Sequence, residues 1–536
     1  TVADANAGIR PVEKLRLRLN PIHPSKQRTS TSMPKSYVKR ILDARIYDLA
    51  VETPIDEAPI LSTRIANRVL LKREDLQPVF SFKLRGAYNK MRQLSEAERA
   101  AGVIAASAGN HAQGLAMAAK KLGVKATIVM PRTTPQIKID GVRARGAKVV
   151  LQGDTYDGAA QHAKKLVDEK GLVYIHPFDD PDVIAGQGTV AVEILRQHPG
   201  PLNAIFVPVG GGGLCAGIVA YVKYVRPDIK VIAVESEDAA CLAAAMEKGR
   251  RVTLKEVGLF ADGTAVAQIG KETFRVLRDT IDGVITVSTD EICAAIKDIF
   301  DDTRSICEPA GALGLAGLKK YVQQSGCSGE TLLAIDSGAN MNFDRLRYIS
   351  ERTEIGEKRE AVLAVTIPEK PGSFKRFCQA LSQRMVSEFN YRYADAGDAH
   401  IFVGIQVTSD ADRQALVDDL LAKDYAVVDM TDNEIAKLHI RYMVGGRAPE
   451  IADEVVYRFE FPERPGALSN FLVKLGGRWN ISMFHYRNHG SAFGRVLVGL
   501  QVPTGERRDV GAFLDALDYP YQEETNNDAY RFFLGQ

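Results

Sequence analysis

Short apolar runs alternate with helix-forming segments from about residue 36 to residue 345, and this alternation constrains the fold more than any other feature of the sequence. The runs are rich in β-branched residues and have the length of buried strands, while the segments between them carry apolar residues at i, i+3 and i+4. Such alternation predicts an α/β domain with a mostly parallel sheet wrapped by helices. The expected strands are Ala126–Met130, Lys148–Leu151, Ala204–Val209, Lys230–Val234 and Thr331–Ile335, and the clearest helices are Ala112–Leu122 and Leu214–Val225.

The last third of the chain has a different texture and contains an internal repeat. Residues 350–360 are charged and nearly free of apolar side chains, which predicts a linker. Beyond it the sequence is strand-rich, and three blocks recur at an offset of 94 or 95 residues. We therefore expect two copies of one α+β domain, at 361–440 and 455–531, behind a domain at 36–349. The paired blocks are IPEKPGSF (367–374) and FPERPGAL (461–468), FNYR (389–392) and FHYR (484–487), and FVGIQV (402–407) and LVGLQV (497–502).

Composition limits the partners of the chain. A formal net charge of +2 on 536 residues gives no electrostatic signature of nucleic-acid binding. No apolar run approaches the ~20 residues that span a bilayer, and the cysteines and histidines show no metal-ligand spacing. We therefore expect no nucleic acid, membrane or metal partner, and a reducing, cytoplasmic location. Residues 1–35 are rich in arginine and poor in acids, which is typical of a disordered tail or, alternatively, of an organelle transit peptide.

Four consecutive glycines, Gly210–Gly213, stand between a predicted strand and a predicted helix. Without Cβ atoms, this turn lets backbone N–H groups approach a phosphate at the helix N-terminus. The same turn fits the G-x-G-x-x-A pattern of dinucleotide folds, ending at Ala216, and Glu235 follows at about the expected 20 residues. This segment therefore leaves a nicotinamide-dependent oxidoreductase open as an alternative.

Two further segments carry candidate chemistry. Lys83 follows the largely apolar run Pro78–Phe82, and a lysine in such surroundings loses its proton more readily, as a Schiff-base amine must. The sequence ASAGNHAQG at 106–114 precedes a predicted helix, and the N–H groups of such a turn bind an anion such as a carboxylate. A solvated surface lysine and a helix cap at Ser107 or Asn110 are the simpler alternatives.

In chain order, Ser-Phe-Lys (81–83), Ser-x-Gly-Asn-His (107–111), the glycine turn and Asp-Ser-Gly-Ala-Asn (336–340) resemble the motifs of the fold-type II pyridoxal-phosphate enzymes. These enzymes share an α/β fold similar to that of the tryptophan synthase β chain. More narrowly, residues 36–345 resemble the threonine dehydratases. The Pro-Gly turns at 371–372 and 465–466 resemble those of ACT-like domains, and the doubled tail is similar to that of the biosynthetic enzymes of the family.

The resemblance implies a role for each matching residue. Lys83 would hold pyridoxal 5′-phosphate covalently and act as the base, with Phe82 against the cofactor ring. Asn110 would hydrogen-bond the 3-hydroxyl of the cofactor, and Ser337 would face its pyridine nitrogen. The phosphate would lie on Gly210, Gly211, Gly212, Gly213 and Leu214, the substrate carboxylate among Ser107, Gly109 and His111, and the ring edge beside Gly263.

The resemblance also implies an activity, which is conversion of L-threonine to 2-oxobutanoate and ammonia, the first committed step of isoleucine synthesis, with L-serine as a secondary substrate. Isoleucine would inhibit a homotetramer and valine would oppose it. An effector would meet Tyr391 with Arg392 and Tyr486 with Arg487, unless these aromatic rings simply pack in a core. Serine dehydratase, serine racemase and threonine synthase share the active-site motifs, and a non-enzymatic amino-acid sensor is a further alternative.

Overall fold

The computed structural model describes residues 33–356 without a gap, together with parts of the remainder of the chain. Residues 1–32 of the expected tail lie outside the described residues, and helix α1 (Met33–Leu42) begins within the last three residues of that tail. The described parts beyond residue 356 are 360–368, 377, 380–381, 384, 386–391, 398–440, 453–462, 479–487, 493–517 and 519–534.

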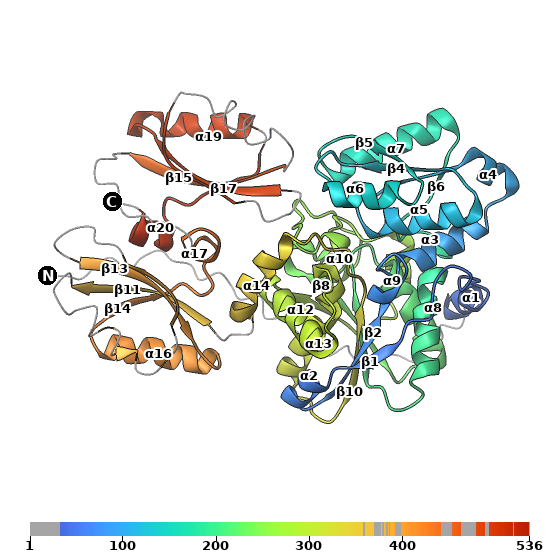
Figure 1. Cartoon of the computed structure of the whole chain (residues 1–536), viewed down its shortest axis with the longest axis horizontal. Helices are drawn as coiled ribbons and strands as arrows, with labels where there is room; N and C mark the ends of the chain where they lie inside the picture. The colour runs from blue at the N-terminus through green and yellow to red at the C-terminus, as the bar shows by residue number, and fades with distance from the viewer. Residues whose placement is uncertain are drawn as a thin grey trace.

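Residues 33–344, called the α/β part below, contain two sheets (Figure 1). In the larger sheet one edge strand is antiparallel and the other neighbours pair in parallel, as the alternation of strands and helices predicts. Three of the expected strands are found in it, each within two residues of the predicted bounds. The strand order is β1 (Ile55–Glu57), β2 (Arg68–Arg73), β10 (Thr331–Asp336), β7 (Ala204–Pro208), β8 (Lys230–Ser236) and β9 (Gly283–Val287).

Helices cover both faces of the larger sheet, which explains why its strands are apolar on both sides. Successive residues of β7 alternate between two cores: Ile205 packs with α8 and α9, and Phe206 packs with α12 and α13. The helices of this lobe are α2 (Pro59–Arg64), α8 (Pro181–Gln197), α9 (Gly213–Val225), α10 (Cys241–Lys248), α11 (Lys271–Leu277), α12 (Thr289–Thr303) and α13 (Pro309–Ser325), with short 3-10 turns η1 (Glu74–Leu76), η2 (Glu237–Ala239) and η3 (Asp262–Thr264).

The smaller sheet has four parallel strands, and the other two expected strands are found in it with the predicted bounds. Helix α3 (Lys83–Arg92) packs with α5 (Asn110–Leu122) in the core of this lobe, and the N–H of Gly86 in α3 also donates a hydrogen bond to the side-chain oxygen of Gln187 in α8 of the larger lobe. Helix α3 therefore joins the two lobes. The order is β5 (Lys148–Leu151), β4 (Ala126–Met130), β3 (Val103–Ala106) and β6 (Val173–Tyr174), with α4 (Glu96–Ala101), α6 (Gln136–Arg143) and α7 (Tyr156–Lys170) around it.

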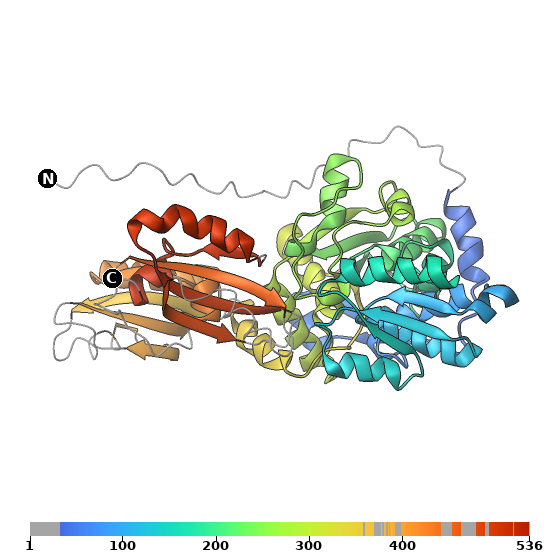
Figure 2. The same cartoon turned by 90° about the horizontal axis from the view of Figure 1, so that it is seen from above.

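The sequence repeat is also a structural repeat, and Figures 1 and 2 show the two copies side by side at one end of the molecule. Each copy has an antiparallel four-stranded sheet with equivalent strand order. The first repeat has β12 (Val386–Tyr391), β13 (Asp398–Gln406), β11 (Glu360–Pro368) and β14 (Ala426–Asp429), with α16 (Asp410–Ala422) and α17 (Glu434–Leu438). The second has β16 (Asn480–Arg487), β17 (Phe493–Gln501), β15 (Glu454–Pro462) and β18 (Tyr521–Glu523), with η5 (Thr504–Glu506), α19 (Arg507–Ala516) and α20 (Asp528–Phe533).

The two repeats share one apolar core between their sheets. Val362 and Phe402 of the first repeat and Val456 and Leu497 of the second are fully buried in it, together with residues of α17 and α20. Asn433, which caps α17, donates a hydrogen bond of 3.1 Å to Asn527, which caps α20. These two residues lie 94 positions apart, so equivalent points of the two copies meet here.

The expected linker at 350–360 is helical as far as Gly356, because α14 (Arg345–Gly356) runs through it. One of its charged residues, Arg352, donates to Asp290 of α12 at 2.6 Å and to Glu434 of α17 at 2.8 Å. Lys437 of α17 also donates to Asp290, at 2.7 Å. The expected linker is thus a helix over its first seven residues, and the ion pairs of Arg352 and Lys437 join the α/β part to the first repeat.

Among the residues that the structure describes, none of the helices combines the length and the apolar character needed to cross a membrane.

Candidate active site

Lys83 is the first residue of α3 and lies where the two lobes meet. Its ammonium donates to the carbonyl of Pro177 at 3.2 Å, and its Nζ lies 5.2 Å from the centre of the Phe82 ring. Burial lowers the pKa of Lys83 to about 8, although the charge of Glu308 acts in the opposite direction. An amine in this state loses its proton close to neutral pH, as nucleophilic and basic lysines require.

The glycine turn lies beside Lys83. It packs against Phe178, and Phe178 follows Pro177, whose carbonyl accepts the hydrogen bond of Lys83. A Cβ on Gly211 would lie 2.2 Å from the ring of Phe178, and a Cβ on Gly213 would lie 3.0 Å from the Phe178 backbone. Gly212 has a φ of 91°, a conformation that favours glycine. Sequence reasoning therefore identified a turn in which glycine is required, at the N-terminus of α9, where backbone N–H groups favour an anion.

Asn110 begins α5, and its amide is held from two sides. Its Nδ2 donates to Glu308, and its Oδ1 accepts a hydrogen bond of 2.7 Å from Asn340. Ser107 caps the N-terminus of α5. Its hydroxyl accepts hydrogen bonds from the N–H groups of Gly109 and Ala112, both at 3.3 Å. The capping alternative thus holds for Ser107, and the Asn110 side chain is directed to other polar groups. Gly109 borders open space, since a Cβ there would meet nothing within 4 Å.

His111 is a buried, neutral imidazole. Burial, followed by the charge of Lys83, lowers the pKa of His111 to about 3. Its Nε2 lies 2.9 Å from the carbonyl of Ile175, so the proton is assigned to Nε2, and its buried Nδ1 has no hydrogen-bond partner. Such an acceptor is available for a donor on a ligand.

Ser337 follows β10 and lies next to the Lys83 segment. Its carbonyl accepts from the N–H of Phe82 at 3.4 Å, and its hydroxyl donates to the carbonyl of Ala310 at 3.3 Å. A bridge between Ser81 and Gly338 joins the same two segments. The structure thus brings Lys83, Asn110, Ser337 and the glycine turn, which sequence reasoning selected separately, to one place between the lobes.

Two residues of this site had no assigned role in the sequence analysis. Glu308 contacts Asn110, and burial raises the pKa of Glu308 to about 7, with the charge of Asp262 acting in the same direction. Asn340 links Asn110 to the carbonyl of Val79, to which it donates at 2.7 Å. A Cβ on Gly263 would lie 3.6 Å from Glu308, which places this glycine at the same site. One sequence signal was available for Glu308: it is an acid flanked by Cys307 and Pro309, with no basic neighbour.

The expected effector residues occupy equivalent strand ends. Tyr391 ends β12 and Arg487 ends β16, with Tyr486 just before it, but their side chains lie outside the described residues. Arg392 lies outside them altogether, as do the Pro-Gly turns at 371–372 and 465–466. The role of these residues therefore stays a prediction.

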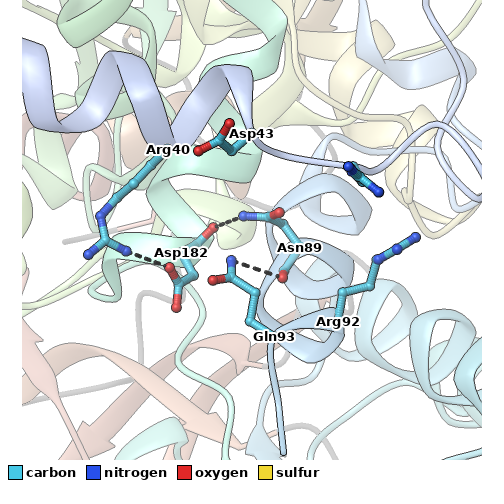
Figure 3. Close-up of a pocket in the computed structure, with 7 residues that line it drawn as sticks. Arg40, Asp43, Asn89, Arg92, Gln93 and Asp182 are labelled. Atoms are coloured by element: carbon cyan, nitrogen blue, oxygen red, sulfur yellow. Dashed lines mark hydrogen bonds and ion pairs between the residues drawn. The ribbon is translucent and has the colours of Figure 1, made fainter.

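A separate cavity of about 280 Å³ lies between α1, α3 and α8 (Figure 3). Arg40 and Asn89 both bind Asp182 in it, through the Asp182 carboxylate at 2.8 Å and the Asp182 carbonyl at 2.7 Å. Its lining mixes both signs of charge and includes none of the residues expected at the active site. The lining residues are Arg40, Asp43, Arg45, Asn89, Arg92, Gln93 and Asp182.

Comparison with known proteins agrees with this geometry. The family model for pyridoxal-phosphate dependent enzymes matches residues 46–338. The model for the C-terminal regulatory domain of threonine dehydratase matches twice, at 351–440 and at 445–534. Fold and site therefore define a pyridoxal-phosphate-dependent enzyme with a doubled regulatory tail.

The relatives narrow the class. A biosynthetic L-threonine dehydratase of Burkholderia multivorans is 58% identical over 93% of this chain and 99% of its own length. The corresponding Escherichia coli protein is 53% identical over 93% and 97%. The solved structure of processed threonine deaminase isoform 2 from Solanum lycopersicum is 49% identical, covers 60% of this chain and 94% of its own, and has a TM-score of 0.59. The chain belongs to the biosynthetic threonine dehydratases.

The oxidoreductase alternative is not supported. Its acidic residue, Glu235, is buried and accepts hydrogen bonds from the N–H groups of Leu242 at 2.7 Å and Ala243 at 2.8 Å. The carboxylate is therefore committed to the N-terminus of α10, where a ribose hydroxyl could not replace these donors without leaving them unpaired. The glycine pattern therefore does not by itself indicate a dinucleotide.

The residues of the site fit pyridoxal phosphate. A readily deprotonated amine at Lys83 suits the aldehyde of the cofactor, and the closely packed glycine turn offers N–H groups to its phosphate. The unpartnered Nδ1 of His111 leaves an acceptor for a ligand within the same site.

Proposed function

We propose that this chain converts L-threonine to 2-oxobutanoate and ammonia and acts on L-serine as a secondary substrate. The observation that carries the proposal is the desolvated amine of Lys83, which lies beside the glycine turn and in the field of Glu308. The printed names of its relatives support threonine as the substrate. L-serine differs by one methyl group, and such a difference is worth only ~1–3 kcal/mol in a pocket.

Pyridoxal phosphate, when bound, supplies the electron sink that acidifies the α-proton of an amino acid. We assign removal of that proton to the Lys83 Nζ, since burial keeps this amine close to its unprotonated form. Asn110, held by Glu308 and Asn340, orients a hydroxyl group at the ring, and the turn Gly210–Gly213 binds the phosphate. Loss of the β-hydroxyl as water leaves an enamine, and addition of water to it releases ammonia and the oxo acid.

The doubled tail supports control by amino acids. Isoleucine inhibits and valine opposes it in this proposal, through sites near Tyr391 with Arg392 and Tyr486 with Arg487. The active form is a homotetramer in the cytoplasm. The free thiols of Cys215, Cys241, Cys293, Cys307 and Cys327 are in keeping with a reducing compartment.

The test is to measure 2-oxobutanoate from L-threonine with the purified holoenzyme, and then to titrate isoleucine and valine. Lys83→Ala should lower kcat at least a thousandfold, because the base is removed. Wild-type protein that forms no 2-oxobutanoate would refute the activity. Activity that changes with neither isoleucine nor valine would refute the proposed regulation. Light scattering measures the oligomeric state.

A further inference from the structure

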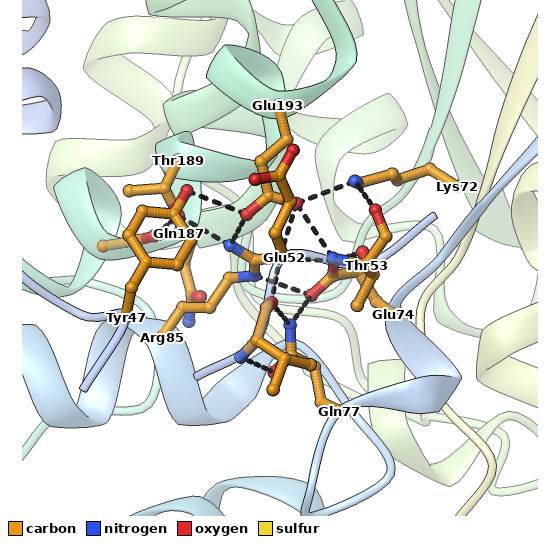
Figure 4. A network of polar contacts seen from close by, with 12 residues as sticks. Tyr47, Glu52, Thr53, Lys72, Glu74, Gln77, Arg85, Gln187, Thr189 and Glu193 are labelled. Carbon is orange, nitrogen blue, oxygen red and sulfur yellow. Dashed lines mark hydrogen bonds and ion pairs between the residues drawn. The ribbon is translucent and has the colours of Figure 1, made fainter. Parts of the chain in front are cut away.

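Four fully buried charged residues, Lys72, Glu74, Arg85 and Glu193, form a network of ion pairs (Figure 4). Arg85 lies two residues after Lys83 on α3, and its guanidinium binds two carboxylates at once. It meets Glu74 with two bonds of 2.7 Å, and Glu193 with bonds of 2.5 and 3.0 Å. Lys72 completes the set by donating to Glu193 at 2.7 Å. The network carries two positive and two negative charges, so its net charge is zero.

The network ties two elements that are close in sequence, η1 and α3, to α8, which lies about a hundred residues further on. Glu74 belongs to η1 after β2, Glu193 to the long helix α8, and Arg85 to the first turn of α3. Tight backbone contacts press on the same turn: a Cβ on Gly186 would lie 2.6 Å from the carbonyl of Arg85, and one on Gly114 would lie 3.1 Å from the Lys83 carbonyl carbon. These contacts therefore fix the position of the first turn of α3.

Stability alone does not account for such a network. Removing charges from water is costly, and apolar side chains of similar volume often replace buried ion pairs without loss of stability. A planar fork that meets two carboxylates does, however, fix direction as well as distance. Each further partner, such as the hydroxyl of Thr189 at 3.1 Å from Arg85, narrows the orientation of α3.

We propose that Arg85 is a positioning residue, which locks the first turn of α3 between η1 and α8 and thereby sets where the Lys83 amine lies relative to the glycine turn. The inference rests on the proposed role of Lys83. It adds that the reaction depends on a guanidinium that touches neither substrate nor cofactor. A shift of about 1 Å in a reacting group costs on the order of a hundredfold in rate, so the lock has a measurable consequence.

The test compares holoenzymes with charge-balanced double variants. Arg85→Met/Glu74→Gln removes one charge of each sign from the network and leaves Lys72 with Glu193. The control, Arg64→Met/Asp298→Asn, removes one charge of each sign from another cluster of the same lobe, in which Asp298 binds both Arg64 and Lys319 at 2.5 Å, so that here too one lysine remains. The measurements are cofactor content, melting temperature, kcat and KM for L-threonine, and circular dichroism of the visible cofactor band, which reports the orientation of the cofactor.

The Arg85→Met/Glu74→Gln variant should keep its cofactor and melt near wild type, with kcat lower by about 10- to 100-fold and KM within about threefold. Its visible dichroism per bound cofactor should fall at least twofold, while the control keeps wild-type values. Arg85→Lys, which keeps the charge but lacks the planar guanidinium, should lose about tenfold in kcat.

Wild-type kcat and dichroism in either Arg85 variant would overturn the proposal. So would equal losses in the control, or a double variant that fails to fold or to hold cofactor, because the network would then serve stability alone. A wild-type protein inactive on threonine would refute the proposed function, while the dichroism still tests Arg85.

Discussion

The amine of Lys83 is the group whose chemistry depends most directly on its surroundings. Burial lowers its pKa to about 8, so the neutral form dominates above that pH. Neutral amine is the form that attacks the aldehyde of the cofactor. Protein stripped of cofactor should therefore capture pyridoxal phosphate at a rate that rises with pH and levels off above about 8. An exposed lysine would require about pH 10.

Stopped-flow absorbance of the visible band between pH 6.5 and 10 measures this capture. Lys83→Arg should show no band and serves as the control. A midpoint near pH 10 would mean that water reaches the amine freely, contrary to the burial seen here.

Glu308 has two separable properties, its acceptor oxygen and its charge. Glu308→Gln keeps an oxygen for the Asn110 amide and removes the titration that burial places at about 7. We expect cofactor affinity within about threefold of wild type and a pH profile of kcat without an inflection near 7. Glu308→Ala removes the acceptor too, and a lost hydrogen bond of this kind, worth ~1 kcal/mol, should weaken cofactor binding about fivefold. Titration of stripped protein with cofactor, alongside kcat from pH 5.5 to 9, distinguishes these outcomes. An unchanged inflection in Glu308→Gln would assign it to another group.

Residues such as Lys83 and Asn110 could be selected from sequence because each lies in a short motif with its own chemical meaning. Glu308 was not selected, because its only sequence signal is the lack of a basic neighbour, and its role comes from contact with Asn110, which is 198 positions away. That contact depends on the order of the strands in two sheets. Hydrophobic periodicity predicts helices and strands, but it does not show which loops contact one another.

At the scale of elements, the five strands predicted from apolar runs are found within two residues of their predicted bounds, as for β4, β7 and β10, whereas β3 and β9 were not predicted. The helix over 350–356 was not predicted, because residues 350–360, SERTEIGEKRE, have the charge of a solvated linker. Arg352 of this segment instead meets Asp290 of α12 and Glu434 of α17, which come from remote parts of the chain. Tertiary contacts decided the structure of this segment.

The turn between β7 and α9 gives a sharp prediction at this scale. Gly211→Ala would bring a methyl group to 2.2 Å from the Phe178 ring, so this ring must move away from the segment that holds Lys83. We expect cofactor affinity to fall at least tenfold, with the melting temperature of the stripped protein lower by a few degrees at most. Gly283→Ala in β9 is the matched control, because a Cβ there meets nothing within 4 Å. Equal cofactor affinity in Gly211→Ala and wild type would show that the ring yields without affecting the site.

At the scale of the whole molecule, Asp290 is the acceptor through which the α/β part holds the first repeat. It binds Arg352 of α14 and Lys437 of α17. Asp290→Asn removes its charge with almost no change in size, so an effector signal that crosses this junction should weaken. We expect the isoleucine concentration for half inhibition to rise at least fivefold, the lower end of ordinary coupling energies, with kcat near wild type.

The control for this experiment is Asp412→Asn, which removes the ion pair of another aspartate, with Arg384, inside the first repeat. Isoleucine inhibition curves of both variants, measured at a fixed threonine concentration, test this prediction. If Asp290→Asn responds to isoleucine as wild type does, the signal takes another route.

The core shared by the two repeats also has a consequence for the history of the chain. A duplicated domain that folds alone can be deleted again, or exchanged for another, without harm to the rest. Here each copy completes the interior of the other: without the second, Val362 and Phe402 of the first would face water. Deletion of one copy would leave an exposed apolar surface on the other. The shared core therefore favours keeping both copies: substitutions elsewhere can change each copy separately, but loss of either exposes the apolar face of the other.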